Sequence, residues 1–78
     1  MLRIKNFIKN DNIIAYDYYC EDNMQDKGHV EYDLEKNQYI KQDFAPSENN
    51  QNIYCSISVE FARKMIETNE TERVFIWY

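Results

Sequence analysis

The sequence predicts an α+β fold: an antiparallel sheet of about five strands, in the order β-β-β-β-α-β, with one helix packed on one face. Three observations predict it. Apolar and polar residues alternate through most of residues 2–44, which is the period of a strand. The period becomes helical over 53–68, and an apolar segment follows at 72–78. With 78 residues, one glycine and one proline, the chain forms a single small domain, 1–78.

Four strands are expected in the first half of the chain. Short polar connections separate them, and consecutive strands joined in this way form an antiparallel meander. The second strand has β-branched and aromatic residues on both faces, which favours a central position in the sheet. Gly28, at the end of the polar loop 22–28, is expected to supply a positive φ. The expected strands span 2–9, 13–21, 29–35 and 39–44.

The helix is expected from about residue 53 to residue 68, after the polar stretch 45–51, with Asn52 as its N-cap. Its downstream half fits only the helical period. Residues 53–58 also alternate as a strand would, so that the pattern leaves this stretch open between helix and strand. The apolar stripe of the helix comprises Ile53, Tyr54, Ile57, Phe61 and Met65.

The last segment, 72–78, is apolar on both faces over Val74-Phe75-Ile76-Trp77. A strand of this kind belongs in the middle of a sheet or against a partner, because both of its faces need to be covered. We therefore expect the segment to pair antiparallel beside the first strand and to lie inside the sheet.

The chain is acidic, with nine Lys and Arg against fourteen Asp and Glu, and its charge is unevenly distributed. Residues 1–10 carry a net charge of +3, whereas residues 11–35 carry eight acidic side chains against Lys27 alone. Nucleic-acid binding draws most of its affinity from neutralised phosphates, and anionic membranes attract basic segments. The charge distribution therefore argues against nucleic-acid and membrane partners and indicates a solvated acidic surface.

Neither a membrane span nor a leader is expected. No apolar run approaches the roughly 18 residues that a span needs, and residues 1–9 alternate charged and apolar side chains, unlike a signal peptide. We therefore expect a cytoplasmic, globular protein.

Two cysteines are too few for a disulfide scaffold, so Cys20 and Cys55 are expected to be reduced and semi-buried.

Several short runs resemble small uncharacterised proteins of Gram-positive bacteria, which are short α+β proteins without an assigned activity. The resemblance implies the same fold order and a bacterial, cytoplasmic setting, and it implies no catalytic or binding residue. The chain departs from that pattern in the loop after the second strand, where it has Cys20 and Asn23 in place of a proline or glycine. The runs are Tyr18-Tyr19, Asp26-Lys27-Gly28-His29-Val30, Tyr32-Asp33-Leu34-Glu35 and Phe75-Ile76-Trp77-Tyr78.

Cys20, His29 and Cys55 are the soft metal ligands that the sequence offers. Their spacings lack the close C-x₂₋₄-C pair of a zinc site, and no motif of a catalytic cysteine surrounds either thiol. A chain of this length also offers little depth for a catalytic cleft. We therefore expect no catalytic, cofactor-binding or metal-binding residue.

Aromatic side chains are the least ordinary feature of the composition. Seven tyrosines supply core area to a short chain, and tyrosine is also enriched at protein interfaces. The helix carries an apolar arc wider than one sheet face requires, so that either a loop or another chain covers its flank. The possible interaction surface comprises Tyr16, Tyr18, Tyr32, Val59, Ile66 and Trp77.

These observations favour a small non-enzymatic protein-interaction module that self-associates as a homodimer. One alternative is an acidic inhibitor, in which the block 11–35 mimics nucleic-acid charge on a partner protein. The other is an enzyme or metal protein that uses Cys20, His29 and Cys55. We expect a protein partner, which includes a second copy of the chain, and no cofactor, nucleic acid or membrane.

Overall fold

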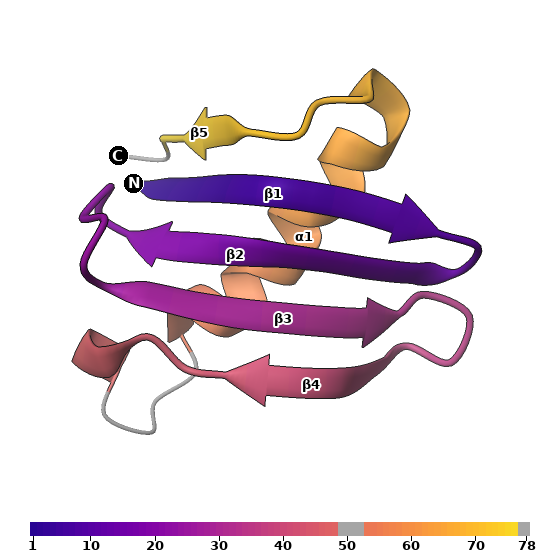
Figure 1. Cartoon of the computed structure of the whole chain (residues 1–78), viewed down its shortest axis with the longest axis horizontal. Coiled ribbons are helices and arrows are strands. Elements are labelled where there is room, and N and C mark those ends of the chain that lie inside the picture. The colour runs from indigo at the N-terminus through magenta and orange to yellow at the C-terminus, as the bar shows by residue number, and fades with distance from the viewer. Residues whose placement is uncertain (49–52, 77–78) are drawn as a thin grey trace.

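In the part of the chain that the structure describes, five strands form one antiparallel sheet, and one long helix crosses one of its faces (Figure 1). The structure is a computed structural model that describes residues 1–48 and 53–76. The elements are β1 (Leu2–Asn10), β2 (Ile13–Cys20), β3 (Lys27–Asp33), β4 (Gln38–Asp43), the 3-10 turn η1 (Pro46–Glu48), α1 (Ile53–Thr68) and β5 (Arg73–Phe75). The strands lie in the spatial order β4-β3-β2-β1-β5. The predicted α+β class and element order are confirmed.

The helix α1 settles the stretch that the sequence pattern left open, because residues 53–58 are helical and the helix ends at Thr68 as expected. Asn69 follows with a φ of 57°, a left-handed conformation that commonly ends a helix and that asparagine tolerates. The expected N-cap, Asn52, lies outside the described residues. Within residues 1–48 and 53–76, no helix is both long enough and apolar enough to cross a membrane.

The strand β5 lies at an edge of the sheet, where the sequence predicted an internal strand. It pairs antiparallel with β1, as expected, with Leu2 opposite Phe75. The prediction of an internal position is wrong, because β1 is the outermost strand of the meander and nothing described pairs with β5 on its far side. Phe75 is buried and Ile76 is 67% exposed, so at these two residues only one side of the chain is covered. Trp77 lies outside the described residues.

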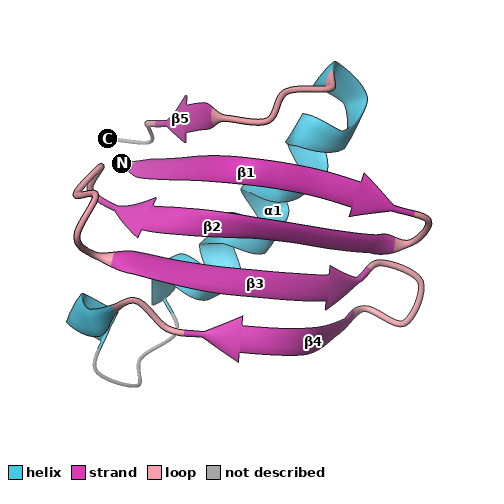
Figure 2. Cartoon of the chain, in the orientation of Figure 1, coloured by secondary structure: helices cyan, strands magenta, loops and turns pink. Residues whose placement is uncertain are grey.

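The core lies between the sheet and α1, which contacts β1, β2 and β3 (Figure 2). The strand β2 is central, as predicted, and alternate residues along it point toward the helix. The hydroxyl of Tyr16 shares a hydrogen bond of 2.8 Å with the hydroxyl of Ser58 on α1, so that both buried polar groups are satisfied. Fully buried side chains include Leu2, Ile4, Ile14, Tyr16, Tyr18, Val30, Cys55 and Met65.

Gly28 has a structural role that differs from the predicted one. It lies inside β3 and does not have a positive φ, which corrects the expectation of a turn glycine. Directly across the ladder is Tyr18, whose ring tip occupies the space that a Cβ at Gly28 would fill. The glycine is therefore required by close side-chain packing and not by backbone conformation.

Candidate interaction surfaces

One face of the sheet has no described helix over it. Figure 1 shows α1 behind the strands. On that side of the sheet, the hydroxyl of Tyr16 bonds to Ser58 of α1 and the hydroxyl of Tyr18 bonds to Glu48 of η1. Asp17, which lies between them in β2, therefore faces the opposite, open side of the sheet. The register places Asp17 opposite His29 in β3, and His29 opposite Asp43 in β4. A row of charged side chains thus crosses the middle of the open face.

A histidine held between two carboxylates forms the centre of this row. The Nδ1 of His29 is 2.8 Å from Oδ1 of Asp17, and its Nε2 is 3.0 Å from Oε2 of Glu31. Asp17 is 8% exposed, and its other oxygen accepts a hydrogen bond of 2.9 Å from the amide of Asn6. The ammonium of Lys27 lies 3.6 Å from that same oxygen. The five groups form one connected polar network.

A β-bulge brings Asn6 into this network. The register between β1 and β2 shifts between Lys5 and Ile8, and Asn6 has a φ of 56°. Asparagine tolerates this left-handed conformation better than most residues, and a bulge redirects the side chain of the extra residue. The bulged strand thereby places an amide donor on the carboxylate of Asp17.

The network shifts the pKa of both of its central groups. Burial acts to lower the pKa of His29, but the hydrogen bonds to Asp17 and Glu31 outweigh it and raise that pKa above 6.5. Burial acts to raise the pKa of Asp17, and the bonds from Asn6 and His29 outweigh it and lower that pKa. The arrangement therefore stabilises an imidazolium between two carboxylates, a state that has no lone pair for a metal ion or for general-base chemistry.

The two thiols lie apart from the histidine. Cys20 and Cys55 are both buried in the core, on the side of the sheet that faces α1. Burial raises the pKa of Cys20 to about 12 and also raises the pKa of Cys55. Among the described residues, no group of three or more His, Cys, Asp or Glu side chains is arranged to hold a metal ion.

A shallow hollow lies beside the network, at the end of the open face near the turn between β1 and β2. Its volume is about 400 Å³. Ile8 is 61% exposed there and lies opposite Ala15, so that the hollow has apolar side chains next to an acidic one. The lining residues are Ile8, Asn10, Asp11, Ile13, Ala15 and Glu31.

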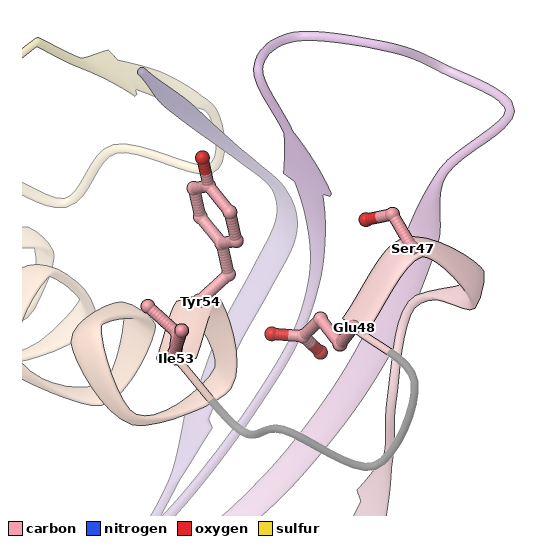
Figure 3. Close-up of a pocket in the computed structure, with 4 residues that line it drawn as sticks. All are labelled: Ser47, Glu48, Ile53 and Tyr54. Carbon is pink, nitrogen blue, oxygen red and sulfur yellow. The ribbon is translucent and has the colours of Figure 1, made fainter.

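A second, smaller pocket of about 80 Å³ lies between η1 and the start of α1 (Figure 3). Its lining includes Glu48, whose side chain is 5% exposed. The carboxylate of Glu48 accepts hydrogen bonds from the hydroxyl of Tyr18 at 2.5 Å, from Ala45 N–H at 3.2 Å and from Cys55 N–H at 2.9 Å. These bonds tie η1, β2 and the first turn of α1 together, so that the role of Glu48 is structural.

The strand β4 is the other edge of the sheet, and it is the most exposed strand. Five of its six residues are exposed. Apolar side chains are among them: Ile40 is 56% exposed, Tyr39 is 37% exposed, and Phe44, directly after the strand, is 37% exposed. The register with β3 shifts between Glu31 and Tyr32, which leaves Ile40 without a direct partner in that ladder.

The residues predicted as an interaction surface are mostly inside the molecule. Tyr16, Tyr18, Tyr32 and Val59 are buried, with exposed fractions between 0% and 7%. Because they pack in the core, these four side chains offer no area to a partner, which corrects that expectation. Ile66 packs against the core and is half-buried, and Trp77 lies outside the described residues.

Sequence reasoning missed the groups that organise both sites. Glu48 stands in a polar stretch with no periodic pattern, and its partners are 30 and 7 residues away along the chain. Asn6 interrupts the alternation of the first strand, and this interruption is the signal that could have indicated a bulge. No family model matches the chain, and neither does any curated protein or solved structure.

Proposed function

We propose that this chain is a small non-enzymatic protein-interaction module that acts by self-association. The observation that carries the proposal is the exposed edge strand β4, which presents Tyr39, Ile40 and Phe44 to solvent at the end of the sheet. An edge strand of this kind is a template for pairing with another chain. Exposed aliphatic and aromatic side chains along it supply apolar area to such a contact.

The state of the chemically reactive groups supports a role without catalysis. Both ring nitrogens of His29 are held by carboxylates, and both thiols are buried with raised pKa values. A nucleophile or general base needs a depressed thiol pKa or a free imidazole lone pair within reach of a substrate. The described groups are instead arranged to stabilise the folded sheet.

The acidic-inhibitor alternative has less support, because most carboxylates of the block 11–35 already accept hydrogen bonds from other groups of the same chain. A mimic of nucleic-acid charge needs rows of free carboxylates at its surface. Here Asp17 is bonded to His29, and Asp22 to the guanidinium of Arg3. Further intramolecular hydrogen bonds engage Glu21, Asp26, Glu31, Asp33 and Glu35.

Sedimentation velocity tests the proposal directly. The wild-type chain should sediment with a weight-average coefficient that rises with concentration, from a few micromolar to several hundred micromolar. A short edge contact gives a weak and rapidly exchanging complex, so the increase in the sedimentation coefficient should be largest at the highest concentrations. A coefficient that stays at the monomer value throughout would contradict the proposal.

A further inference from the structure

The outer edge of β4, with which no described strand pairs, has a charge order that is complementary to itself. Lys41, Gln42 and Asp43 follow one another in the part of the strand that pairs regularly with β3. Lys41 lies opposite Glu31 and Asp43 opposite His29, so both charged side chains belong to the open face. They are 56% and 60% exposed, and within one chain their charged atoms are 3.7 Å apart. An exposed pair of this kind contributes little and is readily exchanged for another.

A two-fold axis perpendicular to the sheet limits how two such edges can pair. Directly opposite residues of an antiparallel pair point to the same face, so one residue must lie opposite its own copy, with the axis midway between the two. An axis at Lys41 or at Asp43 would place like charges opposite each other. An axis at Ile40 would bring no opposite charges together. An axis at Gln42 places Lys41 of each copy opposite Asp43 of the other.

We propose that two copies of the chain pair edge to edge through β4, with Gln42 opposite Gln42 of the second copy and Lys41 opposite Asp43 of the second copy. The same register brings Ile40 of each chain next to Phe44 of the other, so that two exposed apolar side chains cover each other. The result is one continuous antiparallel sheet of ten strands. This inference rests on the proposed self-association and names its surface and its register.

In this register the row of charges on the open face continues from one chain into the other. In one chain the row across the strands runs from Asp17 through His29 to Asp43. In the paired edges it continues to Lys41 and Glu31 of the second copy, because these two residues lie opposite each other in their own chain. The row then alternates in sign across both molecules, and cross-strand pairs of opposite charge stabilise a sheet.

Charge reversal with complementation tests the register. In Lys41→Asp, positions 41 and 43 are both acidic, so that acidic side chains of the two copies lie opposite each other. In Asp43→Lys both positions are basic, so that basic side chains lie opposite each other. Each variant alone should dimerise at least tenfold more weakly than wild type, because two favourable pairs become two unfavourable ones. An equimolar mixture of the two variants should regain wild-type affinity as a heterodimer, and so should the double variant Lys41→Asp/Asp43→Lys. Added salt should reduce these differences.

Two controls separate failure of folding from failure of pairing. Thermal unfolding of each variant at low concentration reports on the monomer, and recovery in the mixture shows that both chains are folded. Ile8→Lys alters an exposed isoleucine of the open-face hollow and should leave dimerisation unchanged, whereas Ile40→Lys should weaken it. In the wild type, the β4 amide protons that point away from β3 should gain protection from exchange as the concentration rises, whereas those already paired with β3 should not.

The possible outcomes distinguish the inference from the function on which it rests. A wild-type chain that stays monomeric would overturn both. A wild-type dimer that is unaffected by either charge reversal, or single variants that do not complement each other in the mixture, would overturn the β4 register and leave self-association standing. A dimer that Ile8→Lys disrupts would show that the open face is the interface instead.

Discussion

The ring of Tyr18 lies over Gly28, its direct neighbour across β2 and β3, and fills the space of the missing side chain. Its hydroxyl is fixed at the far end by the carboxylate of Glu48. An aromatic residue that covers a cross-strand glycine in this way pins the register of the pair. Since the ring is fully buried and its hydroxyl is hydrogen-bonded, the Tyr18 side chain cannot shift to make room for a larger residue at position 28.

Gly28→Ala is therefore expected to destabilise the protein, although alanine normally suits a strand better than glycine. The added methyl group must displace the ring of Tyr18, and overpacking of this kind costs about 1–3 kcal/mol. Urea unfolding should show a lower midpoint. In Tyr18→Leu, which lacks the ring tip, the same Gly28→Ala change should cost much less. Equal costs in the two backgrounds would show that the ring is not the cause.

Glu48→Gln should destabilise the fold because the carboxylate receives three donors. An amide at this position has one acceptor oxygen and would turn N–H donors toward the N–H of Cys55 or the hydroxyl of Tyr18. A buried donor left without an acceptor costs about 1–3 kcal/mol, which chemical denaturation can measure. Glu67→Gln, at an exposed position of α1, is the matched control and should change stability by less than about 0.5 kcal/mol. Similar losses in both variants would contradict the structural role of Glu48.

His29 should make stability depend on pH near neutrality. Its folded pKa is raised above the ordinary value of 6.5, so the folded state holds a proton that the unfolded chain has already released. This stabilisation is fully present below pH 6.5 and is lost as the pH rises through the folded pKa. Unfolding free energies should fall across this window for the wild type, and less so for His29→Gln.

Titration of the chain's one histidine by NMR gives a second measurement. The folded pKa should exceed 6.5, and Asp17→Asn should lower it because that variant loses the carboxylate on Nδ1. A wild-type value at or below 6.5 would mean that burial outweighs the two carboxylates. The network would then not hold an imidazolium.

Both thiols should be inert in the folded protein. Burial raises the pKa of Cys20 to about 12 and raises that of Cys55, so that neither forms the reactive thiolate at neutral pH. A disulfide reagent should react with both at the rate of global unfolding, and denaturant should accelerate both reactions. Rapid modification of one cysteine in the native protein would instead support the enzyme alternative.

The fold could be predicted from the sequence to the extent that local periodicity determines it. Alternation is a property of neighbouring residues, so the strands and the helical segment were found within one or two residues of most of their observed ends. The edge position of β5 depends on which side of β1 the chain returns to, and no local pattern encodes that. Because Phe75 and Ile76 are both apolar, the sequence indicated that both faces of this strand are buried. In the structure Phe75 is buried and Ile76 is exposed.

The candidate sites were harder to predict, because they depend on contacts between distant residues. Tyr16 and Tyr18 were included in a possible interaction surface by residue type, but alternation along β2 turns both toward the side of the sheet that α1 covers. The network around Asp17 needs the register of three strands and a bulge at Asn6. A two-residue change in any of these registers would separate the same side chains.

The last prediction concerns how firmly the edge strand β5 is attached. Phe75 is buried and stacks on Phe61 of α1, with ring centroids 4.4 Å apart, while Ile76 beside it is 67% exposed. Phe75→Ala should cost about 3–5 kcal/mol, because it leaves a cavity between β5 and the helix. Ile76→Ala is the matched control and should cost less than about 0.5 kcal/mol. Both should be compared by urea unfolding at low protein concentration, since any self-association would mask a loss. If the two variants unfold at the same midpoint, β5 adds little to the core, and its pairing with β1 is peripheral to the stability of the sheet.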